Sequence, residues 1–337
     1  MTVSQKDIAR RLGVSVALVS RALSGKAEAI GVSAATVERI RTEAARVGYI
    51  PNASARLLRG APSRTLGVVV LDFEDPFFGP IVGELQRLAH QHGYSLVLGG
   101  FEHRQVKPHD VSALLKHRID GLIILGSETR ANWVRPFLVA GLPAARLGHG
   151  PAKEKMSAVC VDEEAGLREL IEHLTKLGHR RIGFVAGTGP VHERRLEICR
   201  RLLRKFRLSA DDRWIAMGGE IAGIDCGRAA AKILLGRHGE SPTAIIATSD
   251  ALALGALRAL SEEKIAVPQN ISLAGFDDIP LAQNSIPSLT TVRQPLAEMA
   301  RRVFELATDR TTAGSHRVFD FTPRLIIRES THRPPDT

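Results

Sequence analysis

Residues 4–23 read SQKDIARRLGVSVALVSRAL, and this stretch decides the fold of the N-terminal part of the chain. Apolar side chains recur at helical spacing over its first half, stop at Gly13-Val14-Ser15, and resume over its second half. Ser4 suits the N-cap of the first helix and Ser15 that of the second, while Gly13 tolerates the positive φ of a tight turn. The pattern predicts two short helices joined by a three-residue turn, which is the arrangement that places a second helix in the major groove of DNA.

The basic charge of the chain is concentrated around this stretch. Residues 1–62 contain ten lysines and arginines against four acidic residues, whereas the rest of the chain contains 36 against 32. A basic charge gathered in a small module is typical of a surface that binds DNA phosphates. Two helices alone would also fit a helical cap or a protein-docking module, but the charge favours DNA.

A series of short motifs follows. They are GYIPNASARLLRG at 48–60, LGVVV at 66–70, DPFF at 75–78, DGLI at 120–123, LGHRRI at 177–182, GFDD at 275–278, LTTVRQP at 289–295 and RES at 328–330. With residues 1–23, their order and spacing resemble the lactose/galactose repressor family of bacterial transcription regulators along nearly the whole chain. The resemblance implies an α/β protein, with an all-α helix-turn-helix head and two doubly wound parallel-sheet subdomains of the periplasmic-binding-protein type.

Residues 51–63 are expected to form a hinge. Pro51 blocks continuation of a third helix at 34–47, and Asn52 can cap a new, very short one. Because fewer than two turns of isolated helix are unstable in water, this helix should fold only when two copies meet on DNA. The family's hinge leucine, which wedges between base pairs in the minor groove, matches Leu58.

Base reading is expected from the second helix of the head. Val16 and Ala17 offer only apolar contacts, such as those with thymine methyl groups, whereas Arg21 can bind guanine or hold a phosphate. The predicted DNA-binding residues are Ser15, Val16, Ala17, Ser20, Arg21, Asn52 and Leu58. The chain has Leu18 where the family usually has threonine, and residues 26–31 form a longer loop, so the operator sequence stays open.

Beyond the hinge, short β-branched runs alternate with helical segments, which predicts parallel sheets covered on both faces. The expected strands are 66–71, 95–99, 121–125, 144–147, 158–161, 181–186, 214–217, 244–248, 271–275 and 318–321. Expected helices include 78–92, 164–177, 193–206, 226–235 and 251–263. The expected domains are a DNA-binding head at 1–50, the hinge at 51–63, and a two-lobed effector-binding and dimerisation domain at 64–337, with lobes at 64–160 plus 277–293 and at 161–276 plus 294–330.

Composition sets the class of protein. The chain of 337 residues has 44% hydrophobic residues, enough for ordinary cores, and only three cysteines, which share no metal-ligand spacing. Residues 1–12 are polar and charged, and no apolar run approaches the ~20 residues of a membrane helix. A cytoplasmic protein with no metal and no membrane partner is expected.

The resemblance also implies a small-molecule site in the cleft between the lobes. In open parallel sheets ligands bind beyond the carboxyl ends of the strands. The effector-binding residues carried over by position are Asp75, Phe77, Phe78, Arg195, Ser249 and Asp277. Asp278 is expected to brace its loop, and Asp250 is interpreted as a helix cap.

Three positions depart from the family's cleft. The family commonly has aspartate at the position of Gly148, asparagine at that of Ser249, and an aromatic residue near Ile221. Fewer polar groups argue against a plain hexose held by many hydroxyl contacts. Because Arg195 is retained, an acidic or phosphorylated ligand is the working hypothesis.

An enzyme is not expected, because no catalytic constellation and no cofactor motif occurs; GTGP at 187–190 lacks the helix-opening glycine of a dinucleotide fingerprint. The chain ends at 331–337 without the apolar heptads of a tetramerising tail, so a homodimer is expected. The predicted function is transcriptional repression at a pseudo-palindromic operator in double-stranded DNA, controlled by a sugar, a sugar acid or a related metabolite. An effector-independent architectural DNA-binding protein, or a transcriptional activator, remains an alternative.

Overall fold

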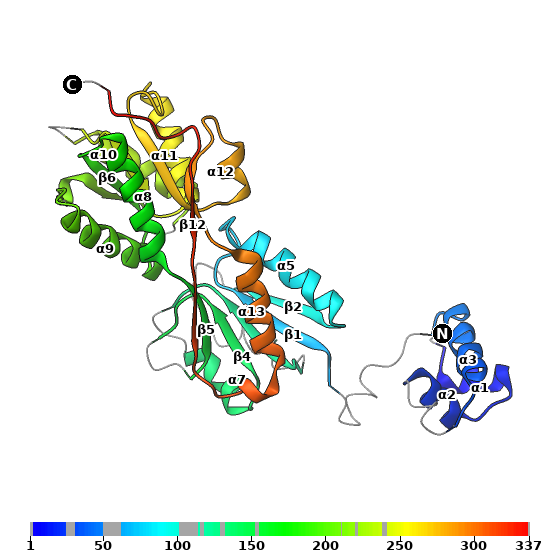
Figure 1. Ribbon diagram of the computed structural model, residues 1–337. Helices are drawn as coiled ribbons and strands as arrows, with labels where there is room; N and C mark the ends of the chain where they lie inside the picture. Colours follow the sequence, from blue (N-terminus) through cyan, green and yellow to red (C-terminus); the bar gives the residue numbers. More distant parts are fainter. Residues whose placement is uncertain are drawn as a thin grey trace. The chain divides into compact units, whose positions relative to one another are not determined.

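The computed structural model divides the chain into two compact units, residues 1–63 and residues 64–337. The structure describes residues 3–24, 31–49, 62–100, 114, 118–128, 132–151, 155–209, 211–219, 222–237 and 241–335. Figure 1 labels many of the helices and strands in both units. Each unit is described by itself.

The described part of the first unit contains three helices, and their ends follow the sequence signals. They are α1 (Gln5–Leu12), α2 (Val16–Leu23) and α3 (Ala34–Arg46). Ser4 and Asp7 form a reciprocal capping box at the start of α1, and Ser15 Oγ accepts a 3.1 Å hydrogen bond from the Leu18 N–H at the start of α2. Gly13 ends α1 in the left-handed region, with φ of 66°. The predicted caps and turn are therefore confirmed.

A small apolar core holds the three helices together. Its buried members are Ile8, Ala9, Val19, Ala22, Val37, Ile40 and Ala44. On α3, Arg39 Nη2 donates a 3.0 Å hydrogen bond to the Leu12 carbonyl at the end of α1. Because this carbonyl has no partner within its own helix, the bond ties the first helix to the third.

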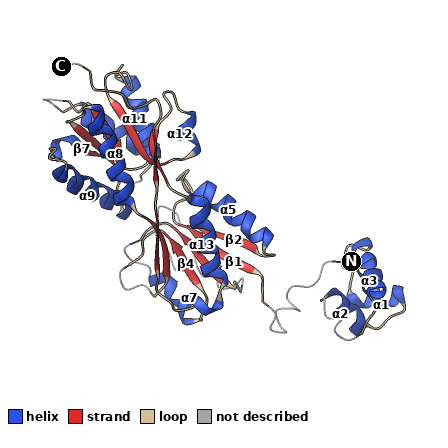
Figure 2. Ribbon diagram, viewed as in Figure 1, coloured by secondary structure: helices blue, strands red, loops and turns tan. Residues whose placement is uncertain are grey.

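The second unit contains two six-stranded sheets, one in each lobe (Figure 2). The strands of the first sheet are β1 (Thr65–Val70), β2 (Ser95–Gly100), β3 (Gly121–Leu125), β4 (Ala144–Leu147), β5 (Ser157–Val161) and β11 (Val318–Phe321). They lie in the order β11-β5-β4-β3-β1-β2, and every described pairing is parallel.

The second sheet repeats the arrangement with one antiparallel strand at its edge. Its strands are β6 (Ile182–Ala186), β7 (Ile215–Met217), β8 (Ala244–Ala247), β9 (Ser272–Asp277), β10 (Thr290–Arg293) and β12 (Arg324–Ile326). They lie in the order β12-β10-β9-β8-β6-β7, and only β12 runs antiparallel to its neighbour among the described pairings.

Helices cover both faces of each sheet, as the alternating pattern predicts. On the first sheet, α5 (Phe78–Gln91) and α13 (Leu296–Thr308) pack on one face, and α7 (Arg135–Val139), with the short turn η3 (Asn132–Val134), packs on the other. On the second sheet, α8 (Glu163–Leu177) and α9 (Pro190–Lys205) lie opposite α10 (Ile224–Leu235) and α11 (Asp250–Glu262). The shorter elements are α12 (Pro280–Asn284), η4 (Asp212–Trp214) and η5 (Arg310–Thr312).

The predicted composition of the lobes is wrong in one respect. The expectation gave 277–293 to the first lobe and 294–330 to the second, yet β10 pairs with β9 in the second sheet, and α13 packs on β3 and β4 in the first. The chain crosses between the lobes at 161–163, at 294–295, and again between β11 and β12. An alternation of strands and helices does not reveal such crossings, because α13 has an apolar stripe that either sheet could bury.

Candidate functional site

The second helix of the head exposes the residues that sequence predicts to read DNA. Val19 and Ala22 lie in the core, which turns Val16, Ala17 and Arg21 outward. Val16 is 44% exposed, so its apolar side chain is accessible to a partner surface.

The remaining residues predicted to contact DNA divide between the described and the undescribed parts of the chain. Ser20 is half-buried on α2, and Ser15 is exposed as its N-cap. Asn52 and Leu58 lie outside the described residues. Among the described residues, none forms an ion pair with Arg21, so its exposed guanidinium is available to a base or a phosphate.

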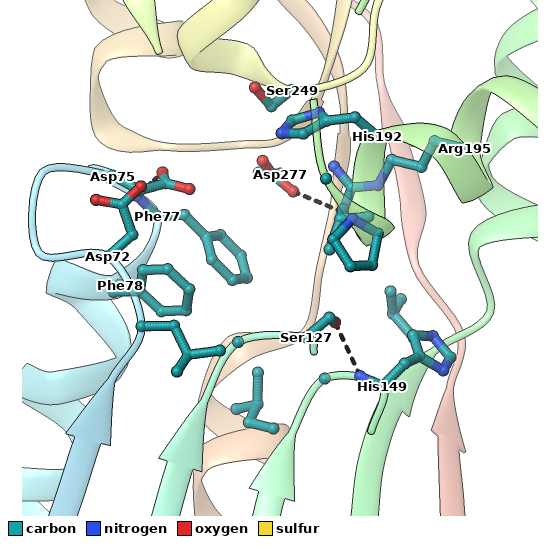
Figure 3. A pocket seen from close by; sticks show the side chains of 18 of the residues that line it. Asp72, Asp75, Phe77, Phe78, Ser127, His149, His192, Arg195, Ser249 and Asp277 are labelled. Carbon is teal, nitrogen blue, oxygen red and sulfur yellow. Dashed lines mark hydrogen bonds and ion pairs between the residues drawn. The ribbon is translucent and has the colours of Figure 1, made fainter. Parts of the chain in front are cut away.

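In the second unit, a cavity of about 430 Å³ lies between the lobes. It is bordered by the loops that follow β1, β3, β4 and β5 of the first sheet and by those after β6, β8 and β9 of the second. All six residues carried over by position line it, namely Asp75, Phe77, Phe78, Arg195, Ser249 and Asp277 (Figure 3). The structure therefore brings together side chains as far apart in the sequence as Asp75 and Asp277.

One side of the cavity combines carboxylates with aromatic rings. Asp72 and Asp75 follow β1, and Phe77 and Phe78 lie at the start of α5; we call these four residues the aromatic-acidic wall. The two rings meet edge to face with centroids 5.3 Å apart. Asp75 Oδ1 accepts a 3.0 Å hydrogen bond from the Phe77 N–H, and Asp72 Oδ1 accepts one of the same length from the Glu74 N–H.

The opposite side is built around Arg195 on α9, whose side chain is only 5% exposed. Its Nε donates to Glu163 Oε1 at 2.8 Å, its Nη1 donates to the Thr248 carbonyl at 2.7 Å, and its Nη2 lies 3.2 Å from Asp277 Oδ1. The guanidinium also stacks on the Phe276 ring, 3.9 Å from its centroid. Burial alone would lower the pKa of Arg195, but the two carboxylates together outweigh it and raise the pKa.

This geometry bears on the hypothesis of an acidic ligand, which stays a prediction. That hypothesis needs Arg195 as a counter-ion for the ligand, whereas its charge is already matched by Glu163 and Asp277. The sequence could not show this, because Glu163 lies 32 positions before Arg195 and Asp277 lies 82 positions after it.

Asp278, in the loop after β9, and Asp250, the first residue of α11, have different roles. Asp278 binds Arg293 and Arg328, the latter at 2.6 Å, so its predicted bracing role is confirmed. Asp250 is not the cap of α11, because Ser249 caps that helix by accepting from the Leu252 N–H. Asp250 is instead fully buried and accepts hydrogen bonds from Ile279 N–H and Thr291 Oγ1.

Burial governs the titration of Asp277, which lines the cavity, and of Asp250, which is not among the lining residues. It raises the pKa of Asp250 to about 6, and it raises the pKa of Asp277 against the opposing effect of Arg195. The carboxylates of Asp250 and Asp75 add to the upward shift of Asp277. Asp75, from the first lobe, is therefore close enough to influence Asp277, from the second.

The floor of the cavity explains one departure from the family. Gly148 has φ of 126°, and a Cβ there would lie 2.9 Å from the carbonyl oxygen of Gly126 and from Ser127 Oγ. Ser127 Oγ accepts a 2.9 Å hydrogen bond from the His149 N–H and so holds the two loops together (Figure 3). An aspartate at this position would be strained in this backbone.

Several lining residues were missed by sequence reasoning. His192 is buried and bonded through Nδ1 to Thr248 Oγ1 at 2.8 Å, and Glu128 pairs with the fully buried Arg146 at 3.1 Å. Gln294 and Met299 come from the crossing before α13 and from α13 itself. Only Gln294 had a signal, since it lies within the LTTVRQP motif. His192 and Met299 are single residues of ordinary helices, and Glu128 is a single residue of the loop after β3.

Gln294 joins the site to the crossing between the lobes. Its Nε2 donates a 2.8 Å hydrogen bond to Asp277 Oδ1, the same oxygen that faces Arg195. Asp277 ends β9 of the second lobe, and Gln294 follows β10 as the chain passes to the first lobe. One hydrogen bond therefore connects a cavity-lining carboxylate to the crossing between the lobes.

Comparison with known proteins agrees with both units. Residues 4–52 match the family described as bacterial regulatory proteins, lacI family, and residues 171–331 match a periplasmic binding protein-like domain. The chain is 34% identical over 340 residues to the HTH-type transcriptional regulator GalS of Salmonella typhimurium, covering 97% of this chain and 96% of the relative.

Two solved structures show the same architecture. The crystal structure of the lac repressor dimer bound to operator and the anti-inducer ONPF has a TM-score of 0.83 and 26% identity, covering 98% of this chain and all of that one. The transcriptional regulator CelR–cellobiose complex has a TM-score of 0.69 and 27% identity, covering 97% and 99%. Among the described helices, none has the length and apolarity to cross a bilayer. These relatives are regulators of transcription and not enzymes, and the chain belongs to the lacI family of bacterial regulatory proteins.

Proposed function

We propose that this regulator is a homodimeric repressor whose affinity for a pseudo-palindromic operator is set by a small molecule in the interlobe cavity. One observation carries the proposal. The same chain joins a helix with an outward face of Val16, Ala17, Ser20 and Arg21 to a two-lobed unit with a cavity between its lobes. The first part can bind DNA, and the second can bind a ligand.

The DNA half of the proposal follows from the exposed face of α2. Val16 and Ala17 can contact thymine methyl groups, and Arg21, which follows one turn later on the same face, can donate two hydrogen bonds to guanine. One such helix reads one half-site, so a pseudo-palindrome requires two copies. The lac repressor dimer is bound to its operator in the same architecture, which supports a dimer here.

The hinge would couple the two units. Residues 51–63 carry Asn52 as a helix cap and Leu58 as a minor-groove wedge. The two hinges of a dimer can pair only when the first lobes of the two protomers are suitably spaced. A ligand that rearranges the two lobes of each protomer would therefore change operator affinity. The protein would work in the bacterial cytoplasm and associate with the nucleoid when bound to DNA.

The ligand half rests on contacts from both lobes. A molecule in the cavity would touch Asp75 and Phe77 of the first lobe and Arg195, Ser249 and Asp277 of the second. It would stabilise the lobe arrangement in which both sets of contacts form, and it can shift the equilibrium only by its differential affinity for the two arrangements. The CelR–cellobiose complex shows a sugar held by a protein of this architecture.

The test starts from an operator selected by the full-length protein out of genomic DNA fragments. Fluorescence anisotropy then gives the operator affinity with and without each of a panel of sugars, sugar acids, amines and nucleosides. Arg21→Ala should lose specific binding, whereas Arg258→Ala, an exposed arginine paired with Glu262 on α11, should keep it. If no compound changes the specific operator affinity, the effector-independent alternative holds. If Arg21→Ala binds the operator as tightly as the wild type, α2 is not the helix that reads the bases.

A further inference from the structure

His149 and Cys160 meet at a part of the cavity lining that the residues carried over by position do not include. His149 follows β4, Cys160 is in β5, and both line the cavity. The Cys160 sulfur lies 3.3 Å from the Gly148 carbonyl oxygen and 3.5 Å from His149 Nδ1. The thiol therefore lies between a carbonyl group and an imidazole ring, and it can form hydrogen bonds with both.

The backbone holds His149 beside Cys160. Strands β4 and β5 are neighbours in the first sheet, and the Gly148 N–H extends their ladder with a 2.9 Å hydrogen bond to the Val159 carbonyl. The His149 N–H in turn donates a 2.9 Å hydrogen bond to Ser127 Oγ in the loop after β3 (Figure 3). The sheet and the neighbouring loop therefore fix the backbone from which the ring reaches the thiol.

The thiol and the ring each carry one proton at neutral pH. Cys160 is 2% exposed, and burial raises the pKa of its thiol to about 12, so the sulfur remains protonated. Burial lowers the pKa of His149, and the positive charge of Arg194 lowers it further, so the ring is neutral. The other charged groups that act on the ring are Glu163, Asp320 and Arg195. Two protons are therefore available to the carbonyl, the sulfur and the ring.

Only one placement of these two protons gives every group a partner. The Gly148 carbonyl can only accept, so it takes the hydrogen bond from the thiol. His149 Nδ1 can donate or accept, and it then donates to the sulfur. The reverse placement, in which the thiol donates to Nδ1, would leave the carbonyl without this donor. The ring proton is therefore on Nδ1, and Nε2 carries a lone pair.

Nε2 of this ring is open to a ligand. It forms no hydrogen bond with any residue that the structure describes, and His149 is only half-buried where it lines the cavity. A nitrogen lone pair accepts from a hydroxyl or an N–H group, whereas an ether, keto or carboxylate oxygen has no proton to offer it. His149 therefore distinguishes a ligand group that donates from one that only accepts.

We propose that His149 Nε2 accepts a hydrogen bond from a hydroxyl or N–H group of the effector, and that Cys160 is the positioning residue that keeps the ring in the required tautomer. This inference rests on the proposed function, because it assigns a role within the same cavity. His149 belongs to the first lobe, and Asp277 belongs to the second. A polyhydroxylated ligand that donates to both would join the lobes through two directional contacts.

The tautomer can be measured without any ligand. Long-range proton–nitrogen NMR spectra of the full-length protein, prepared with isotope-labelled histidine, separate a ring nitrogen that carries a proton from one that does not. The His149 signals are assigned by their loss in His149→Phe. In the wild type we expect the proton on Nδ1 at about pH 7.5, which lies above the usual pKa of a histidine ring.

Removal of the thiol tests the role of Cys160. In Cys160→Ala no sulfur accepts from Nδ1, so the ring should become a mixture of its two tautomers. Cys226→Ala is the matched control, because Cys226 is also buried and also donates to a backbone carbonyl, that of Gly218, but lies on α10 in the second lobe. The control should leave the His149 signals unchanged.

A second experiment combines the ring variant with altered ligands. Galactose, glucose, ribose, cellobiose and adenosine are tested by calorimetry and by operator anisotropy, each beside derivatives in which one hydroxyl is replaced by fluorine, which cannot donate. A compound that binds should lose affinity on the order of tenfold when the hydroxyl that faces His149 is replaced. The same replacement should change its affinity for His149→Phe by less than about twofold.

The outcomes separate this inference from the proposed function. A wild-type ring with its proton on Nε2 would overturn the acceptor role of His149. Fluorine derivatives that lose the same affinity for the wild type and for His149→Phe at every position would also overturn it, with effector control intact. An unchanged tautomer in Cys160→Ala would overturn the role of Cys160. If no compound binds or changes operator affinity, the acceptor role and effector control are both overturned.

Discussion

Arg195 Nε donates a 2.8 Å hydrogen bond to Glu163 Oε1, and both side chains are only 5% exposed. Arg195 is on α9, and Glu163 is the first residue of α8, directly after the chain crosses between the lobes. The ion pair therefore fixes one wall of the cavity to the crossing.

Loss of Arg195 should weaken the fold as well as the site. Arg195→Ala leaves two buried carboxylates without their cation, and we expect the free energy of unfolding to fall by about 3–5 kcal/mol in urea titrations. Arg195→Lys keeps the charge but cannot reach Glu163, Thr248 and Asp277 together, so it should fold and lose the effector response. An alanine variant as stable as the wild type would contradict the buried network.

Asp250 should give the protein a distinctive pH dependence. Its pKa of about 6 in the folded state lies above the 3.8 of an ordinary aspartate, so the folded protein binds the proton more tightly than the unfolded chain does. Its contribution to stability therefore rises as pH falls from about 6 toward 4, and it is lost as pH rises again. Compared with Asp250→Asn, the wild type should gain about 2 kcal/mol between pH 7 and pH 4.5, measured by urea unfolding at each pH. If the difference in unfolding free energy between the wild type and Asp250→Asn does not change with pH, Asp250 does not cause the pH dependence.

Restoring the residue that the family commonly has should change stability differently at Gly148 and at Ser249. Gly148→Asp places a Cβ 2.9 Å from backbone atoms of Gly126, at a φ of 126°, and should lower stability by about 1–3 kcal/mol. Ser249→Asn has an extended φ of −154° and retains a side-chain oxygen that can cap α11, so it should be tolerated within about 1 kcal/mol. Thermal unfolding of both variants tests the contrast; equal stability of the two would remove the steric explanation for Gly148.

The N-cap of α2 should matter to DNA binding without touching the bases. Ser15→Ala removes the hydrogen bond to the Leu18 N–H and should destabilise this helix by about 1 kcal/mol. Hydrogen exchange of the full-length protein should quicken in α2 about fivefold, with weaker operator binding. Ser33→Ala, at the cap of α3, is the matched control and should quicken exchange in α3 instead. If α2 exchanges at the same rate in Ser15→Ala and Ser33→Ala, the Ser15 cap does not stabilise α2.

Leu58 is predicted to act as a minor-groove wedge. Leu58→Ala should weaken specific operator binding by about tenfold or more while changing non-specific binding little, because only the specific complex includes the kink. Anisotropy with operator and with scrambled DNA of equal length measures both. An equal loss on the two DNAs would refute the wedge.

Local signals allowed much of the fold to be predicted. Ser4, Gly13 and Ser15 mark the ends of α1 and α2 with chemistry that acts over three or four residues, and the caps are where those residues place them. The expected strands also occur within a few residues of their predicted bounds. The path between the lobes could not be predicted, since the apolar stripe of α13 could pack on either sheet.

The cavity was harder to predict than the fold. Asp75, Arg195 and Asp277 lie together, but their charge state depends on pairings that join α8, α9 and β9. Motif position identified the arginine, and only the three-dimensional arrangement showed that its charge is already matched. A binding residue's partners inside the protein decide what it can offer a ligand.

The internal pairing of Arg195 also bears on the resting state of the regulator. Inorganic phosphate and sulfate are attracted to an arginine that has no carboxylate partner. Here Glu163 and Asp277 already occupy that position, so the empty cavity is insulated from such ions. Binding of phosphate or sulfate to Arg195 should therefore play no part in the control of operator affinity.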